Sequence, residues 1–172
     1  MVCTGNLCRS PMAHALLEHR LQESGCEDVE VASTGTWAYD GNPATPEAVS
    51  VLSGRGVDLS QHRSRALDPA ELEDSDVVVV MTSVHLREVS AMAPDLVDRV
   101  VLMKELPEID LRDLSLEAPR EERVRSLLSA PRPQRRRSLD LDDPMGLPTS
   151  SYERALREIE AGVEVLVRVL CS

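Results

Sequence analysis

The sequence predicts an α/β fold, with a small, doubly wound parallel sheet of about four strands flanked by helices. Short β-branched segments alternate with segments of helical periodicity, which is the order expected for parallel strands joined by crossover helices. Residues 76–81 (DVVVVM) are a continuous apolar run, typical of a parallel strand covered on both faces. A length of 172 residues corresponds to one domain. We therefore expect residues 1–172 to fold as a single domain.

The N-terminal elements are predicted to be a helix, a strand and a second helix. A Ser–Pro pair followed by apolar residues at helical spacing predicts a helix that is capped by Ser10 and stopped by Gly25. Residues 29–32 alternate as a short strand. After a loop rich in turn residues, residues 46–55 are predicted to form the second helix.

The rest of the chain continues this alternation. Residues 83–92 are predicted to form a helix and residues 99–103 a strand. Residues 105–141 lose regular periodicity and contain several prolines, although residues 120–128 within them fit a helix. A capping box at residues 150–153 (SSYE), followed by apolar residues at a 3.6-residue period, predicts a long closing helix.

Composition and charge exclude several classes of protein. The chain is 42% hydrophobic and 28% charged, as in globular proteins, and no apolar run is long enough for a membrane span. The N-terminus has no basic-then-apolar targeting pattern, so we expect a cytoplasmic protein. The net charge of −11 argues against nucleic-acid binding, because phosphates would repel such a surface. The basic run at residues 132–137 (RPQRRR) is expected to be a solvated loop rather than a docking site.

The four cysteines, Cys3, Cys8, Cys26 and Cys171, are expected to be thiols rather than a disulfide framework, as is usual in the cytoplasm. Their spacing matches no zinc pattern, and we expect no metal. No function is assigned to Cys26 or Cys171.

The most specific motif is the Cys-x5-Arg loop at residues 3–9 (CTGNLCR), which leads into a predicted helix start. Such a loop can point successive backbone N–H groups at one oxyanion, and Gly5 and Asn6 tolerate the left-handed conformations that this winding requires. Arg9 matches two phosphate oxygens, and the helix N-terminus adds positive potential. The same elements favour the thiolate of Cys3 and make it the candidate nucleophile. The residues expected to bind phosphate beside Arg9 are Thr4, Gly5, Asn6, Leu7, Cys8 and Ser10.

Together with Ser33–Gly35, His62–Arg65 and a late Asp-Pro pair, this loop resembles the low-molecular-weight protein tyrosine phosphatases, whose domain is flavodoxin-like. The resemblance implies that a phosphoprotein is hydrolysed in two steps through a phosphocysteine, without metal or cofactor. A poorly leaving oxygen must be protonated, and the family places its general acid in the Asp-Pro pair. Asp143 is the corresponding residue, and the alternatives are Asp140 and Asp142.

The resemblance also implies supporting and substrate-contacting residues. A hydrogen-bond network that supports the loop would be formed by Asn6, Ser10, Ser33 and His62. Trp37 and Tyr39 lie where the family has an aromatic wall beside the substrate ring, although simple packing of Trp37 in a loop is an equal alternative. Cys8 could form a reversible disulfide with Cys3 that protects the nucleophile, or it could be a plain buried thiol.

Some residues depart from the family pattern. His14, expected to be solvated, stands where an acidic residue is usual, and Met145 and Gly146 stand where aromatic residues often follow Asp-Pro. A branch of the family that hydrolyses phosphoarginine resembles this chain at Gly146 and in the Met-Thr-x-x-His pattern ending at His85, but it usually has Thr in place of Leu7. An apolar Leu7 on the pocket floor favours an aryl ester, so phosphotyrosine is the expected substrate and phosphoarginine the alternative.

Two other functions are considered. The thioredoxin-coupled arsenate reductases share the loop but need two more cysteines after the central strand, and residues 82–170 contain none, so arsenate reduction is not expected. In the resembled fold about five apolar residues lead into the loop, whereas only Met1 and Val2 do so here. Losing three or four buried aliphatic side chains would cost about 5–12 kcal/mol, comparable with the stability of a domain. The natural product could therefore begin upstream, or the chain could be an impaired phosphate-binding or interaction protein.

Overall fold

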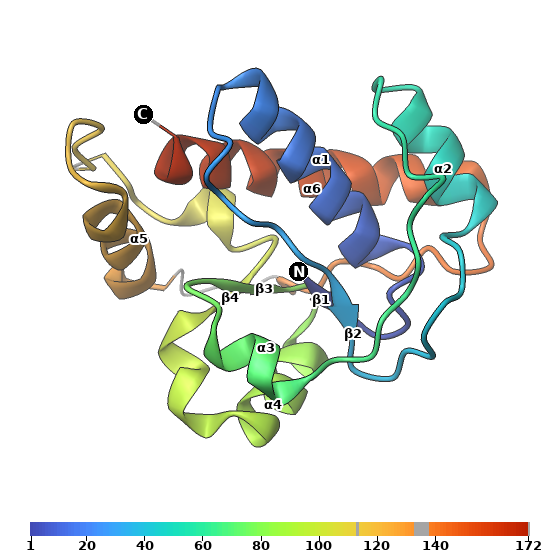
Figure 1. Cartoon of the computed structure of the whole chain (residues 1–172), viewed down its shortest axis with the longest axis horizontal. Coiled ribbons are helices and arrows are strands. Elements are labelled where there is room, and N and C mark those ends of the chain that lie inside the picture. Colours follow the sequence, from blue (N-terminus) through green and yellow to red (C-terminus); the bar gives the residue numbers. More distant parts are fainter. Residues whose placement is uncertain (113, 133–137, 172) are drawn as a thin grey trace.

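A computed structural model describes residues 1–112, 114–132 and 138–171, so residues 133–137 of the basic run lie outside the described residues. The four strands form one parallel sheet in the order β2-β1-β3-β4 (Figure 1), which confirms the predicted fold class. The strands are β1 (Val2–Cys3), β2 (Thr34–Gly35), β3 (Val78–Val80) and β4 (Val100–Leu102). Although β1 has only two residues, it is central and pairs with strands on both sides.

Helices cover both faces of the sheet. One face carries α1 (Arg9–Glu23), α2 (Pro46–Ser53) and α6 (Thr149–Leu170), and the other carries α3 (Pro69–Glu73) and α4 (Ser83–Met92), as Figure 1 shows. Two 3-10 helices, η1 (Pro94–Arg99) and η2 (Leu106–Glu108), flank β4, and α5 (Arg120–Ser129) packs against α6. No helix among the described residues is both long enough and apolar enough to cross a membrane.

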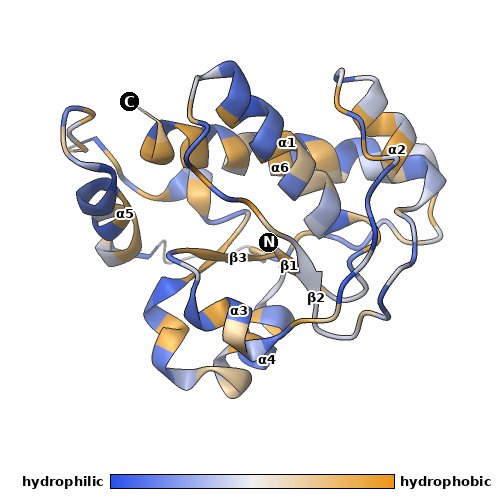
Figure 2. Cartoon of the chain, viewed as in Figure 1, coloured by the Kyte–Doolittle hydropathy of each residue, from blue (hydrophilic) through white to orange (hydrophobic). Residues whose placement is uncertain are grey.

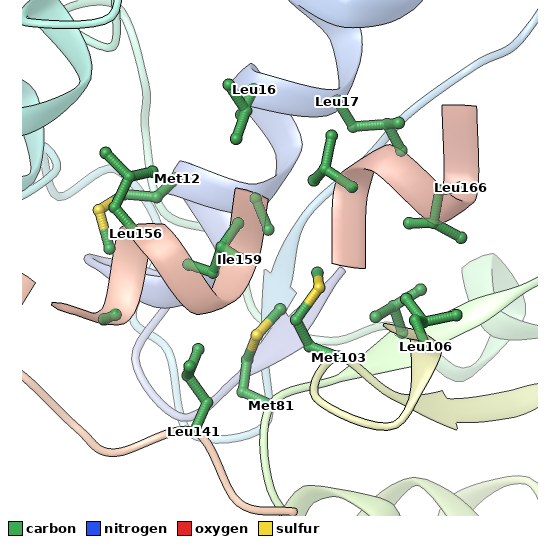
Figure 3. Close-up of a cluster of buried hydrophobic side chains, with 14 of the residues drawn as sticks. Met12, Leu16, Leu17, Met81, Met103, Leu106, Leu141, Leu156, Ile159 and Leu166 are labelled. Carbon is green, nitrogen blue, oxygen red and sulfur yellow. The ribbon is translucent and has the colours of Figure 1, made fainter. Parts of the chain in front are cut away.

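The apolar run of β3 is buried on both faces, as its composition predicts. Val79 belongs to the core beneath α1 and α6, whereas Val78 and Val80 belong to the smaller core beneath α3 and α4. Figure 2 shows apolar residues along the strands and on the helix faces turned toward them. Since the chain contains no Phe, aliphatic and methionine side chains fill the larger core, which Figure 3 shows between α1, α6 and the sheet. Tyr152 is its one aromatic member among the described residues.

Several predicted elements differ from those observed. Residues 29–32 form no strand, because the register pairs Val2 with Thr34 and leaves these residues beyond the end of β1. The closing helix begins at Thr149 after Pro148, without a side-chain cap, so the predicted capping box lies inside the helix. The helix predicted within the irregular segment is α5, and α4 has the predicted bounds.

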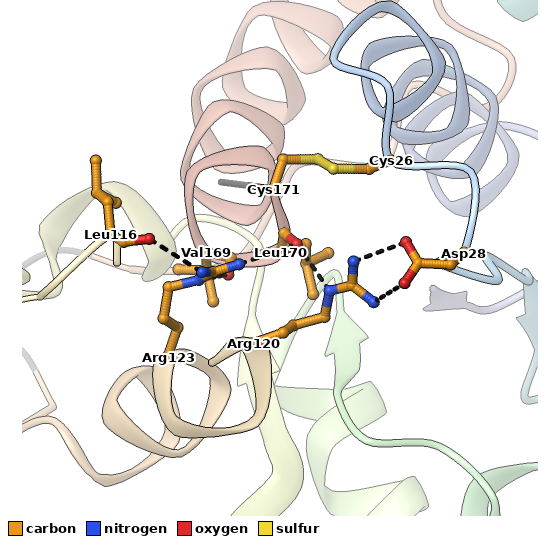
Figure 4. Close-up of a disulfide and its surroundings, with 8 residues drawn as sticks. All are labelled: Cys26, Asp28, Leu116, Arg120, Arg123, Val169, Leu170 and Cys171. Carbon is orange, nitrogen blue, oxygen red and sulfur yellow. Dashed lines mark hydrogen bonds and ion pairs between the residues drawn. A yellow bond between two sulfur atoms is a disulfide. The ribbon is translucent and has the colours of Figure 1, made fainter. Parts of the chain in front are cut away.

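A disulfide joins Cys26 to Cys171, so the prediction that these residues are thiols is wrong. The bond ties the end of α6 to the loop after α1, with a Cα–Cα distance of 5.9 Å (Figure 4). Beside it, Arg120 donates to the Asp28 carboxylate at 2.7 Å and to the carbonyl of Leu170 at 2.8 Å. The prediction failed because it was based on the expected compartment, which carries no information about which cysteines the fold brings together.

Candidate active site

The Cys-x5-Arg loop lies at the carboxyl end of a central strand. Cys3 is the last residue of β1, and α1 begins at Arg9, so the loop runs from strand to helix within five residues. Ligand sites of parallel sheets lie at this edge, and the helix N-terminus adds backbone N–H groups and positive potential. The Sγ atom of Cys3 is 3.0 Å from the hydroxyl of Ser10, and both residues are buried.

Asn6 holds the loop from inside. Its φ of 53° is the only positive value among the described non-glycine residues. Gly5, which was expected to tolerate a left-handed conformation, does not adopt one. The buried Asn6 amide donates to the hydroxyls of Ser10 at 2.9 Å and Ser33 at 3.0 Å, and its Oδ1 accepts the N–H of Arg65 at 2.9 Å. A left-handed Asn fixed at three points gives the loop one defined shape.

His62 supports the same residue from outside the loop. Its Nε2 donates to the carbonyl of Asn6 at 2.8 Å, which fixes the tautomer because a carbonyl can only accept. Burial lowers the pKa of His62. The structure thus brings together all four residues of the expected supporting network.

The hydroxyl of Ser10 has another role than the predicted helix cap. Cys8 precedes α1 and provides no side-chain cap, while Ser10 lies inside the helix. Its hydroxyl accepts from Asn6, contacts Cys3, and donates to the carbonyl of Thr34 at 3.3 Å. The first N–H groups of α1 therefore have no side-chain cap and are free to face a ligand in the loop.

Arg9 and Asp143 meet at the mouth of the loop. The Arg9 side chain is 5% exposed and donates from Nη1 to the carbonyl of Leu141 at 3.1 Å and from Nη2 to the Asp143 carboxylate at 2.8 Å. The two alternative carboxylates are engaged elsewhere. Asp140 accepts the N–H of Ser83 at 2.6 Å, at the start of α4, and Asp142 lies 3.8 Å from Arg154. Of these three carboxylates, only Asp143 contacts Arg9.

An open pocket adjoins the loop. Its lining consists of Thr4, Arg9, Thr82, Val84, His85, Asp140, Leu141, Asp142 and Asp143. The described residues contain no group of three or more histidine, cysteine or carboxylate side chains that could hold a metal ion. His85 and Thr82 were not identified as site residues from the sequence. Two signals were available: the Met-Thr-x-x-His pattern that ends at His85, and the position of both residues directly after β3, at the same edge of the sheet as Cys3.

The expected aromatic wall does not line this pocket. Trp37 and Tyr39 are 73% and 84% exposed, and the indole N–H of Trp37 donates to Glu88 of α4 at 2.9 Å. Leu7, expected on the pocket floor, is also absent from the lining and packs partly buried against the larger core.

Cys8 is a buried thiol in this structure, and Cys3 is also free. The Sγ atom of Cys8 is 3.6 Å from the hydroxyls of Thr45 and Tyr152, and burial raises the pKa of this thiol.

His14 is not solvated as predicted. Its side chain is 26% exposed, and its Nδ1 lies 3.2 Å from the hydroxyl of Ser33, so it adds a fifth side chain to the network. Burial, reinforced by the N-terminal ammonium group and His62, lowers the pKa of His14 to about 4. His14 is thus a neutral hydrogen-bonding partner where an acidic residue was expected for the family.

Comparisons with known proteins agree with this geometry. A family model described as "Low molecular weight phosphotyrosine protein phosphatase" matches residues 1–121. The probable low molecular weight protein-tyrosine-phosphatase EpsP of Ralstonia solanacearum is 38% identical over 113 residues, which are 66% of this chain and 74% of that protein. A protein-arginine-phosphatase of Geobacillus stearothermophilus is 39% identical over 104 residues, which are 60% of this chain and 67% of that protein.

Solved structures extend the likeness to almost the whole chain. The crystal structure of a low molecular weight protein tyrosine phosphatase from T. tengcongensis has a TM-score of 0.75 and 29% identity, covering 96% of this chain and 94% of that one. The YwlE arginine phosphatase from Geobacillus stearothermophilus has a TM-score of 0.70 and 30% identity, covering 96% and 86%. The chain belongs to the low molecular weight phosphotyrosine protein phosphatase family.

Proposed function

We propose that this protein hydrolyses phosphotyrosine in phosphoproteins, with Cys3 as the nucleophile. The observation that carries the proposal is the position of Cys3 at the end of a central strand, 3.0 Å from Ser10 and beside the N-terminus of α1. The positive potential at a helix N-terminus suits a negatively charged group at this position. A cysteine held in this way is poised for attack on phosphorus.

In the first step, Cys3 Sγ forms a bond to phosphorus while the bond to the tyrosyl oxygen breaks. The Arg9 guanidinium and the loop N–H groups hold the three equatorial oxygens, where charge gathers in the transition state. Asp143 gives its proton to the departing oxygen. In the second step, Asp143 takes a proton from water, the water oxygen bonds to phosphorus, and the S–P bond breaks to restore the thiolate.

Substrate binding should break the ion pair between Arg9 and Asp143. Asp143 holds one edge of the guanidinium, which the phosphate must also use. When the dianionic ester binds, it replaces the carboxylate on Arg9. Asp143 is then released toward the leaving oxygen and takes up from solvent the proton that it gives to that oxygen. The matched family residues end at 121, so the assignment of Asp143 relies on this contact and on the Asp-Pro motif.

Phosphoarginine is the second candidate substrate. It is favoured by the relatives named protein-arginine-phosphatase and by the pocket carboxylates of Asp140, Asp142 and Asp143, since acidic groups suit a cationic guanidino group. Turnover of matched phosphotyrosine and phosphoarginine peptides decides between the two. Faster turnover of the phosphoarginine peptide would reverse the order proposed here.

The general-acid assignment is tested with two esters of different leaving groups. Asp143→Asn should lower kcat/KM for a phosphotyrosine peptide by about 10²–10⁴-fold, and kcat/KM for p-nitrophenyl phosphate much less. This constant reports the first step, in which nitrophenolate leaves without protonation. Asp142→Asn is the matched control, since its exposed carboxylate neighbours Asp143 but does not contact Arg9. An equal fall in kcat/KM for both esters would show that Asp143 is not the acid.

A further inference from the structure

His85 connects the nucleophile loop to the end of β3. It lies in the first turn of α4 and is 2% exposed. Its Nε2 is 2.9 Å from the hydroxyl of Thr4, the residue that follows Cys3, and its Nδ1 is 2.9 Å from the hydroxyl of Thr82. Thr4, Thr82 and His85 all line the pocket that contains Arg9 and Asp143.

The hydroxyl groups of Thr4 and Thr82 allow only one placement of the proton on the His85 ring. The Thr82 hydroxyl oxygen caps α4 by accepting the backbone N–H of His85 at 3.3 Å. Within the part of the chain that the structure describes, this hydroxyl has no acceptor other than Nδ1 of His85. Thr82 therefore donates to Nδ1, so the ring proton is on Nε2 and is donated to Thr4. The hydroxyl proton of Thr4 is then left for a partner in the pocket.

The assignment requires a neutral ring, because a protonated imidazole could accept from neither hydroxyl. Burial lowers the pKa of His85, and the positive charge of Arg9 lowers it further. The carboxylates of Glu88, Asp143 and Asp140 act in the opposite direction, but burial is the largest effect. The position of the ring in the first turn of α4 also disfavours a positive charge.

We propose that His85 is a positioning residue that turns the Thr4 hydroxyl into a hydrogen-bond donor for an oxygen of the phosphate bound in the pocket. This role of His85 rests on the proposed function, because it requires that the pocket binds phosphate monoesters. By donating from Nε2, His85 occupies a lone pair of Thr4 and fixes the direction of its O–H group. A phosphate oxygen only accepts, so a fixed donor is the group that it needs.

The test measures the dissociation constant of inorganic phosphate by calorimetry. Thr4→Val and His85→Ala should each weaken phosphate binding by about tenfold, the usual effect of one hydrogen bond to a charged group. Because His85 acts through Thr4, His85→Ala should have no further effect in the Thr4→Val protein. A full additional tenfold loss in the double variant, or unchanged binding by Thr4→Val, would overturn the proposal.

Conservative variants separate positioning from packing. His85→Gln can place an amide N–H near the site of Nε2 and should recover most of the lost affinity, whereas His85→Asn reaches only the site of Nδ1 and should behave like His85→Ala. His19→Ala is the matched control, because His19 lies on α1 away from the pocket and pairs with Glu23. If His85→Asn binds phosphate as well as His85→Gln does, the ring acts by packing alone. Should His85→Ala fail to fold, the comparison of Thr4→Val with Thr4→Ser still decides, since serine keeps the hydroxyl.

A spectroscopic readout completes the test. Long-range ¹⁵N–¹H NMR of the wild-type protein should show His85 with its proton on Nε2, and a proton on Nδ1 would contradict the proposal. Phosphate binding and the tautomer are measured without turnover, so they remain informative if the wild-type protein fails to hydrolyse phosphotyrosine. Failure of hydrolysis alone would refute the proposed function and leave the role of His85 in phosphate binding to be judged by these two measurements.

Discussion

The close approach of β2 to the nucleophile loop makes Gly35→Ala a sharp perturbation. A Cβ atom on Gly35 would lie 2.5 Å from the carbonyl oxygen of Thr4, 2.9 Å from the backbone nitrogen of Asn6 and 2.9 Å from Cβ of Ala38. Two of these contacts are with loop backbone, which cannot rotate away as a flexible side chain can. One methyl group would therefore push the phosphate-binding backbone out of position.

The losses of stability and activity can be estimated from these distances. Overpacking of a well-packed site typically costs about 1–3 kcal/mol, and Gly35 should lie at the upper end because backbone atoms receive the overlap. A misplacement of about 1 Å can reduce a rate by about 10²-fold. We therefore expect a loss of about 2–3 kcal/mol in the free energy of unfolding and a fall of about 10- to 100-fold in kcat/KM.

Urea denaturation and steady-state hydrolysis of p-nitrophenyl phosphate measure the two effects. Gly54→Ala is the matched control, because a Cβ there would have only the carbonyl oxygens of Val51 at 3.4 Å and Ser50 at 3.9 Å within reach, and Gly54 lies at the end of α2. This control should change stability by less than about 1 kcal/mol and leave kcat/KM unchanged. Wild-type stability and activity of Gly35→Ala would refute the argument from close approach.

Two further predictions concern stability. Because the folded-state pKa of His14 is about 4, below its value of 6.5 in the unfolded chain, the unfolded state binds more protons between these values. The free energy of unfolding should therefore fall by up to about 3 kcal/mol as pH drops from about 6.5 to about 4, and His14→Gln should remove this part of the slope in urea denaturation; an unchanged slope would contradict it. The Cys26–Cys171 disulfide spans 145 residues, so replacing both cysteines by serine should lower stability by up to about 5 kcal/mol in the chain-entropy model. An equal loss is expected when a reductant is added to the wild-type protein, and no loss in either case would contradict it.

Much of the fold could be predicted from the sequence, because its strongest signals are local. The apolar run of β3 and the helical sequences of α4 and α5 each specify their own segment, and the structure agrees with them. Elements that depend on distant partners were predicted less well. The strand at Thr34–Gly35 is set by the register of β1, and the Cys26–Cys171 bond by the docking of α6 beside α1. Neither leaves a local pattern in the sequence.

The site was predicted where its motif is contiguous. Residues 3–9 were identified together, whereas His85 and His14 were not, because single histidines on helices are usually ordinary surface or core residues. The prediction that Ser10 caps α1 is wrong, and the reason is informative. Ser-Pro is a strong helix-start signal, but here the hydroxyl contacts Cys3 and Asn6 instead of the helix backbone. Local rules are often broken at functional sites, where a side chain has another role.

Cys3 is expected to become phosphorylated during turnover. The most direct measurement is acid quenching of Asp143→Asn during hydrolysis of p-nitrophenyl phosphate, followed by peptide mass spectrometry. Loss of the base that activates water slows the second step, so the intermediate should accumulate. One phosphoryl group is expected on Cys3 and none on Cys8. Turnover without any phosphorylated Cys3, or continued turnover by Cys3→Ser, would contradict it.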